Sequence, residues 1–427
     1  MSTESNHNQQ TAGVRTHKLS NGLTIVGEAM QKRAAAWTFL IPAGAATETA
    51  GQEGASGVLE GLSYRGAGAR DSRQLSDALD DLGIDRGGGA ETEYTTFGGA
   101  TLGDYLPQAL ELYADILRRP RLLQDDFPPE DLEAERALAL QALDSLEDNP
   151  ARKMFVQLRR VYFPDNYGRS AMGTREGLNA LSLEALQADY QARFRPDGAI
   201  LSLAGGIDFD DVVKRVESLM GDWQGSGPQA GKPQAVSQAG VHHIAQETSQ
   251  SHIGVAYAGV PSDHPHFYDY RVAVSVLSGG MGARLFTEVR EKRGLVYSVS
   301  ASASSLRGCG FTLAYAGTTP ERSQETLDVL LSELRRVADG VSQAEVERAK
   351  IGMLSGLVMQ EESSRARAGA IARDQFVLGR VRPIDEVTDA INRVSPQSVA
   401  DFFKELPPRD FTVVTLGPKE LKVNDAP

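Results

Sequence analysis

Cysteine is nearly absent from this sequence, histidine is missing from most of its first half, and long apolar runs do not occur. The single cysteine, Cys309, excludes an intrachain disulfide and a cysteine-rich metal cluster. No stretch approaches the ~20 apolar residues that span a bilayer. The polar segment 1–14 has no signal-peptide core and is predicted to be disordered. We therefore expect a cytoplasmic protein.

Positive charge is also scarce relative to negative charge. The 44 Lys and Arg residues against 57 Asp and Glu residues give a formal net charge of −13. Because phosphate backbones require a basic face, this balance excludes nucleic acid as an expected partner. At roughly 100–200 residues per domain, the 427 residues suggest two large domains or several small ones.

A stretch rich in Gly, Pro, Gln and Ser divides the chain into halves of similar length. Segment 223–240 has no apolar periodicity and is typical of a linker. The domains predicted from it are residues 15–222 and 241–427. Each half mixes helical patterns with several strand patterns, which indicates an α+β sandwich of helices on an antiparallel-rich sheet. We expect two homologous domains of this type facing each other as a clamshell.

The two halves follow one plan. In each, a strand pattern and an amphipathic helix precede a long helix that contains Glu-x-Glu-Arg-Ala, and an apolar strand closes the half. The similarity predicts an old duplication. The segments are 95–102, 107–117, 133–146 and 199–204 in the first half, and 310–316, 320–337, 345–359 and 411–416 in the second.

Segment 53–67, EGASGVLEGLSYRGA, resembles the signature helix of the pitrilysin/insulinase family of zinc metallopeptidases, which includes mitochondrial processing peptidase. In active members this helix reads Gly-x-Ala-His-x-x-Glu-His-Met. Its two histidines bind zinc, and the glutamate between them is the general base for the zinc-bound water. The resemblance covers residues 15 to 420.

This sequence lacks the zinc ligands that the resemblance implies. The histidine positions are Gly57 and Gly61, the base position is Glu60, and the third ligand position in the later helix is Ala142. No histidine occurs between positions 17 and 242, so the first half has none to offer. Glu60 is interpreted as a solvated or salt-bridged relic. Each helical glycine costs about 1 kcal/mol relative to alanine, which suggests that the space beside it is open or closely approached.

Segment 277–299, LSGGMGARLFTEVREKRGLVYSV, predicts a glycine turn, a helix over residues 284–292 capped by Gly294, and a strand over 295–303. The block resembles the second-half signature of the same family. The resemblance implies that Tyr297 donates a hydrogen bond to the developing oxyanion and that Arg290 holds substrate carbonyls. The alternative interpretation is an ordinary exposed arginine and a half-buried strand tyrosine.

Segment 87–95, GGGAETEYT, falls where the family carries its substrate-pairing edge strand. It contains Ala90, Glu91 and Thr92, to which a peptide would add by main-chain hydrogen bonds. The residues of this segment differ from the family's usual motif.

Three functional hypotheses follow. The first is the non-zinc-binding subunit of a heterodimeric peptidase of bacterial type, with zinc in the sibling subunit and no hydrolysis by this chain alone. The second is a non-enzymatic peptide-binding or scaffold protein, and a homodimer of this chain is compatible with that hypothesis. The third is hydrolysis by this chain alone through an unrecognised metal site. Peptide is the expected ligand in each case.

Overall fold

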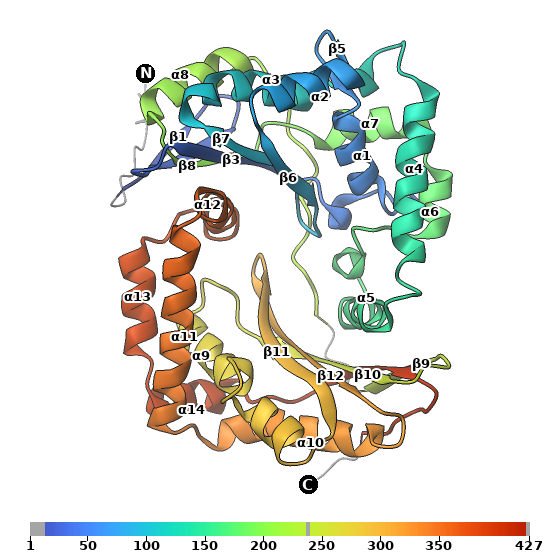
Figure 1. Ribbon diagram of the computed structural model, residues 1–427, viewed down its shortest axis with the longest axis vertical. Helices are drawn as coiled ribbons and strands as arrows, with labels where there is room; N and C mark the ends of the chain where they lie inside the picture. The colour runs from blue at the N-terminus through green and yellow to red at the C-terminus, as the bar shows by residue number, and fades with distance from the viewer. Residues whose placement is uncertain (1–12, 236–239, 424–427) are drawn as a thin grey trace. The chain divides into compact units, whose positions relative to one another are not determined.

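The computed structural model describes residues 13–235 and 240–423, which form two compact units. Of the described residues, the first unit contains 13–144, Arg169–Gly231 and Gln360–Pro383, and the second contains Ser145–Gly168, 232–235, 240–359 and 384–423. Each unit has one large sheet and helices that cover it (Figure 1). This architecture confirms the predicted α+β class.

The sheet of the first unit has six strands in the order β1-β2-β8-β3-β7-β6. The β2–β8 pair is parallel and the other pairs are antiparallel. Side chains alternate across it, so that Trp37 and Phe39 of β3 enter one core and Leu40 enters another. The strands are β1 (Val14–Lys18), β2 (Thr24–Ala29), β3 (Ala34–Ile41), β6 (Asp85–Ala90), β7 (Thr95–Leu102) and β8 (Ile200–Gly205).

Most helices of the first unit cover the face that bears Trp37 and Phe39. The opposite face is covered by α12 (Ser364–Leu378), whose Ile371 and Phe376 are buried against the sheet (Figure 1). The other helices and the small β4–β5 ribbon are α1 (Ala55–Ser63), α2 (Ser72–Asp81), α3 (Leu106–Arg118), α4 (Pro129–Asp144), α6 (Arg175–Ala180), α7 (Leu183–Arg193), α8 (Phe209–Met220), β4 (Gly66–Ala67) and β5 (Arg70–Asp71).

The sheet of the second unit has five strands in the order β11-β12-β10-β13-β9. Its β13–β9 pair is parallel and its other pairs are antiparallel, so it repeats the arrangement of β6-β7-β3-β8-β2. This correspondence agrees with the duplication predicted from the sequence. The strands are β9 (Gly240–Ala245), β10 (Ser251–Gly259), β11 (Val296–Leu306), β12 (Cys309–Thr318) and β13 (Thr412–Gly417).

One face of the second sheet packs against helices that include α9, α10 and α14, while α5 lies on β10 and β13. Gly254 of β10 allows α5 to approach, because a Cβ there would lie 2.8 Å from the Met154 methyl. The helices are α5 (Pro150–Tyr162), α9 (Phe267–Ser278), the π-helix η5 (Phe286–Glu291), α10 (Ser323–Arg336), α11 (Gln343–Glu361), α13 (Ile384–Arg393) and α14 (Pro396–Glu405).

The two halves of the sequence therefore exchange one helix each. Helix α5 comes from the first half and belongs to the second unit, and α12 comes from the second half and belongs to the first. The predicted linker has no helix or strand over residues 224–235, and 236–239 lie outside the described residues. The predicted disordered segment lies outside them up to residue 12, and Val14 begins β1. Among the described helices, none has the length and hydropathy required to cross a membrane.

Candidate functional site

The glycines at the two histidine positions both lie on α1, one turn apart. A Cβ at Gly57 would meet only the Ala171 carbonyl oxygen, at 3.4 Å. A Cβ at Gly61 would lie 2.8 Å from the carboxyl carbon of Glu135, which extends from α4. Of the two alternatives drawn from the sequence, close approach therefore holds at Gly61.

Glu135 is held beside Gly61 by an ion pair. Its Oε1 accepts a hydrogen bond from Arg65 Nε at 2.7 Å and lies 2.6 Å from Arg65 Nη2 in the ion pair. Asp131, one turn earlier on α4, lies 3.7 Å from Arg65 Nη1. Arg65 thus ties the C-terminal side of α1 to α4 while its guanidinium balances two carboxylates.

Glu60 faces the same region and is half-buried. Burial, and after it the nearby charge of Glu135, together raise the pKa of its carboxyl to about 7. Over the described residues the Glu60 side chain makes no hydrogen bond or ion pair. Among these residues, a salt bridge therefore does not account for Glu60.

The predicted third ligand position, Ala142, lies on the exposed side of α4 near its end. Zinc in proteins is bound by Cys, His, Asp or Glu, and Gly57, Gly61 and Ala142 have no such atoms. Of the carboxylates in this region, Glu135 is already paired with Arg65. In residues 13–235 and 240–423, no group of three or more His, Cys, Asp or Glu is arranged to hold a metal ion. The three predicted ligand positions on α1 and α4 therefore offer no atom that binds zinc.

A buried polar network that sequence reasoning missed positions α1. The Glu48 carboxylate accepts hydrogen bonds from the Ser56 and Gly54 amides, at 2.8 and 3.1 Å, and so caps the helix start. Burial nevertheless raises its pKa. Arg193 of α7 donates to Ser56 Oγ at 3.0 Å and pairs with Asp189, and both charged side chains are almost fully buried. No sequence motif links Glu48, Asp189 and Arg193 to α1, so the sequence alone does not predict this network.

Arg290 lies on a helix that differs from the prediction. The expected helix over residues 284–292 exists, but its segment Phe286–Glu291 is a π-helix in which the Lys292 amide donates to the Thr287 carbonyl at 3.0 Å. π-Helical turns are rare in proteins as a whole, and those that occur are often found at functional sites. The Arg290 guanidinium lies 4.9 Å from the centre of the Phe286 ring and is exposed. Gly294 has φ +59°, as a C-terminal glycine requires.

Arg290 is distinguished from the cations beside it by Glu288. The Glu288 carboxylate accepts hydrogen bonds from Lys292 at 2.7 Å and Arg293 at 3.0 Å. These bonds, first that of Lys292, hold the pKa of Glu288 below its usual value. Among the described residues, no carboxylate pairs with Arg290. The spacing of four residues between Glu288 and Lys292 is a signal in the sequence for such a pair on one helix face.

Tyr297 lies at an irregularity in β11. Val296 pairs with Thr318 and Ser298 pairs with Gly317, so Tyr297 is the extra residue between two consecutive ladder positions. A bulge of this kind redirects a side chain away from the regular alternation. The Tyr297 side chain is 67% exposed, so the alternative of a half-buried strand tyrosine does not describe it.

The predicted peptide-pairing residues lie at the end of β6, which is an edge strand. Ala90 is its last residue. The carbonyl oxygens of Glu91 and Thr92 already accept hydrogen bonds from the Ala45 and Ala46 amides, at 2.9 and 2.8 Å. The backbone of Glu91 and Thr92 is therefore committed to the first unit, and the edge available for strand addition is β6 itself.

Known proteins similar to this chain span nearly all of it. Residues 24–175 match the family described as Insulinase (Peptidase family M16), and residues 180–353 match the domain described as Peptidase M16 inactive domain. An uncharacterised zinc protease of Streptomyces coelicolor is 29% identical over 95% of this chain and 90% of that protein. An uncharacterised zinc protease of Bacillus subtilis is 27% identical over 95% of this chain and 98% of that protein.

Two solved structures have the same fold. The peptidase M16 inactive domain from Pseudomonas fluorescens has a TM-score of 0.85 at 20% identity, covering 96% of this chain and 98% of that one. A chain of complex III2 from Candida albicans has a TM-score of 0.82 at 18% identity, covering 94% and 95%. Family matches over residues 24–353 and similarity along nearly the whole chain agree with the motifs at α1 and η5. The chain belongs to the insulinase family, peptidase family M16.

Proposed function

We propose that this chain is the non-metal subunit of a heterodimeric zinc peptidase and that a sibling subunit of the same family carries the zinc. The observation that carries the proposal is a contrast within the chain. The three ligand positions have no metal-binding atoms, whereas Arg290 and Tyr297 are retained, exposed and without a described carboxylate partner. The relatives named zinc proteases support the reaction class.

In this proposal the chain binds and orients an extended peptide. The Tyr297 hydroxyl donates a hydrogen bond to the oxyanion that develops on the scissile carbonyl, and Arg290 donates hydrogen bonds to substrate carbonyls. The β6 edge, ending at Ala90, pairs with the peptide main chain. The sibling's zinc supplies the activated water, and hydrolysis takes place only in the heterodimer.

Co-expression with the sibling tests the proposal, and the reading frame beside this one is the first place to search for a chain with an intact His-x-x-Glu-His helix. Tyr297→Phe is expected to lower kcat by about 10²–10³, the usual loss for one oxyanion donor. Arg290→Ala is expected to lower kcat/KM. Arg152→Ala, on the exposed side of α5, and Tyr105→Phe are matched controls that leave the rate unchanged. Unchanged peptidase rates in both Arg290→Ala and Tyr297→Phe contradict the proposal.

A second candidate is a non-enzymatic peptide-binding or scaffold protein. It is favoured by the similarity to a chain of complex III2, since the same fold there is part of a larger assembly. Light scattering and peptide capture distinguish it from the first proposal. A stable homodimer that captures peptides and gives no hydrolysis with any zinc-bearing sibling favours this alternative.

Hydrolysis by this chain alone is the third candidate. Elemental analysis of the purified chain decides it, because this candidate requires about one equivalent of bound metal. Stoichiometric zinc together with peptidase activity would replace the first proposal.

A further inference from the structure

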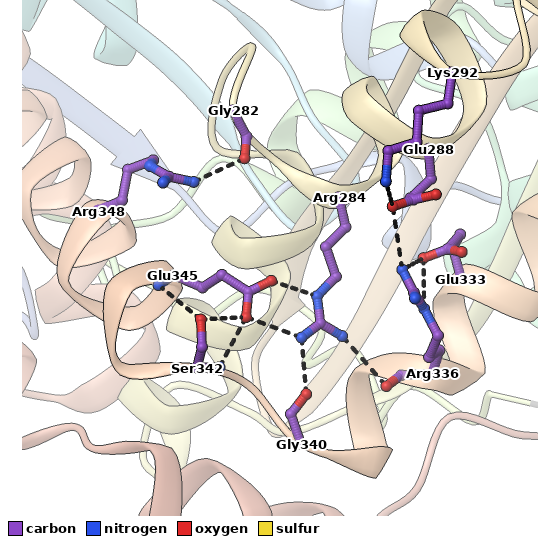
Figure 2. Close-up of polar contacts among 10 residues, drawn as sticks. All are labelled: Gly282, Arg284, Glu288, Lys292, Glu333, Arg336, Gly340, Ser342, Glu345 and Arg348. Atoms are coloured by element: carbon purple, nitrogen blue, oxygen red, sulfur yellow. Dashed lines mark hydrogen bonds and ion pairs between the residues drawn. The ribbon is translucent and has the colours of Figure 1, made fainter.

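A polar cavity of about 410 Å³ borders the helix that carries Arg290. Its wall is built by the glycine turn before that helix, the helix itself, the end of α10 and the start of α11 (Figure 2). Charged side chains dominate the wall, and they pair with one another across it (Figure 2). All these elements belong to the second unit.

At the start of the helix, Arg284 forms an ion pair with Glu345 of α11. Arg284 Nε donates to Glu345 Oε1 at 2.6 Å, and Arg284 Nη2 donates to Oε2 at 3.0 Å and to the Gly340 carbonyl at 2.8 Å (Figure 2). Fork-shaped pairs of this kind fix both orientation and distance. The hydrogen bonds from Arg284, and after them those from Ser342, lower the pKa of Glu345 to about 2, so the pair stays ionised at physiological pH.

The glycine turn has its own contact with α11. Arg348 Nη1 donates to the Gly282 carbonyl at 2.9 Å (Figure 2). Gly280 in the same turn has φ +145° and no heavy atom within 4 Å of a Cβ position, so the turn has little packing to hold it. The turn and the first residue of the helix are therefore held by side chains of one neighbouring helix.

At the other end, Glu288 binds the cations that surround Arg290. Besides Lys292 and Arg293, it lies 3.8 Å from Arg336 of α10, which also pairs with Glu333 at 2.6 Å (Figure 2). Lys292 and Arg293 lie within three residues of Arg290 and would compete with it for an acceptor on a ligand. Their pairing with Glu288 leaves Arg290 as the cation of this short segment with no described carboxylate partner.

We propose that Glu345 and Glu288 are positioning residues for Arg290: Glu345 anchors the start of the helix through Arg284, and Glu288 withdraws the competing cations at its end. The proposal deepens the proposed function, because it assigns the residues that select which guanidinium meets the peptide carbonyls. Neither glutamate touches the peptide. A purely structural role for the two ion pairs is the alternative.

Arginine-selective labelling with p-hydroxyphenylglyoxal, quantified by peptide mass spectrometry, tests the presentation of Arg290 without a partner or substrate. In the unaltered chain Arg290 is expected to react faster than Arg284 and Arg293. Glu288→Gln is expected to raise the Arg293 rate about two- to fivefold, as loss of a partly exposed ion pair implies, and to leave Arg290 unchanged. Glu345→Gln should raise the Arg284 rate. Equal rates for Arg290 and Arg293 in the unaltered chain overturn the proposal.

Glu347→Gln is the matched control for α11, because Glu347 is half-exposed and pairs only with Lys350 and Gln343 among the described residues. It should change no labelling rate at Arg284, Arg290 or Arg293. Far-UV circular dichroism and urea midpoints establish that each variant is folded before it is labelled.

Peptide affinity separates positioning from structural support. The probe is a fluorescein-labelled, unstructured 20-residue peptide with an amidated C-terminus, followed by fluorescence anisotropy. Glu345→Gln is expected to raise Kd about three- to tenfold in the unaltered chain and to have no effect in an Arg290→Ala background, because a positioning residue acts through Arg290. An equal loss in both backgrounds means structural support alone and overturns the proposal. If the unaltered chain binds no peptide, the proposed function fails, and the labelling rates still decide whether the two glutamates control Arg290.

Discussion

The carboxylate of Glu135 fills the space that a side chain at Gly61 would need. The two residues lie on different helices, α4 and α1, and the Arg65 guanidinium holds the carboxylate in place through a hydrogen bond of 2.7 Å and an ion-pair contact of 2.6 Å. Where active relatives of the family are expected to carry a zinc-binding histidine, this chain therefore has a structural ion pair against a bare helix backbone.

The first prediction contrasts the two glycines of α1. Gly57→Ala is expected to raise the free energy of unfolding by about 0.5–1 kcal/mol, since alanine favours the helix and its methyl makes only an ordinary contact. Gly61→Ala must displace Glu135 from Arg65 and is expected to lower the free energy of unfolding by about 1 kcal/mol. Urea denaturation measures both. In a Glu135→Ala background Gly61→Ala should become stabilising, and continued destabilisation there would show that Glu135 is not the obstacle.

The second prediction concerns pH. The folded-state pKa of Glu60, about 7, lies above its ordinary value of 4.5, so the folded protein retains a proton that the unfolded chain releases. The stability from this group is complete below about pH 4.5 and is lost as the pH rises through 7. Glu60→Gln is therefore expected to stabilise the protein by about 2–3 kcal/mol at pH 8 and little at pH 5.

Urea midpoints at the two pH values check this prediction, with Glu133→Gln as the control on an exposed glutamate. The control should show the same change at both pH values. A Glu60→Gln effect that does not depend on pH would mean that Glu60 is ionised in the folded protein at pH 5.

The third prediction tests the docking of α5 on the second sheet. Gly254→Ala places a methyl group against the Met154 thioether and is expected to cost about 1–3 kcal/mol by overpacking. In a Met154→Ala background, Gly254→Ala should cost much less, because the thioether that it meets is gone. Thermal unfolding of the two single variants and the double variant gives the coupling energy. Additive effects would indicate that α5 does not pack on Gly254 in solution.

The fourth prediction concerns the buried pair behind α1. Arg193→Met leaves the Asp189 carboxylate buried without its partner and is expected to cost about 3–5 kcal/mol. A double variant, Arg193→Met with Asp189→Leu, removes both charges and should be markedly more stable than the single variant. Chemical denaturation compares them. If the single variant loses less than the double one, the pair is not the stabilising element that its burial implies.

Much of the fold was predictable because local patterns carry it. The strand over residues 95–102 coincides with β7, and the predicted helix over 345–359 lies within α11. Apolar periodicity and turn residues are sufficient for such elements. The exchange of α5 and α12 was not predictable, since the residues that each helix contacts lie far away in sequence and no spacing rule connects Met154 to Gly254.

The candidate site was predictable only in its residue identities. Arg290 and Tyr297 followed from a motif, but the π-turn around Arg290 and the bulge at Tyr297 depend on how η5 and β11 meet their neighbours. The engagement of the Glu91 and Thr92 carbonyls by Ala45 and Ala46 is likewise a tertiary contact between separate segments. The sequence motif identifies the side chains with chemistry, Arg290 and Tyr297, but not the carboxylates of Glu288 and Glu345, which form their ion pairs in the folded second unit.

The exchange of helices has a consequence for biosynthesis. As the chain leaves the ribosome, the face of the first sheet that bears Val26, Leu40 and Ile200 has no cover until α12, which ends at Leu378, has been synthesised. Most of the protein must therefore be translated before its first sheet is complete on both faces. During that interval the nascent chain presents an apolar surface of the kind that chaperones bind, and a message truncated at the linker would yield a sheet with one face permanently bare.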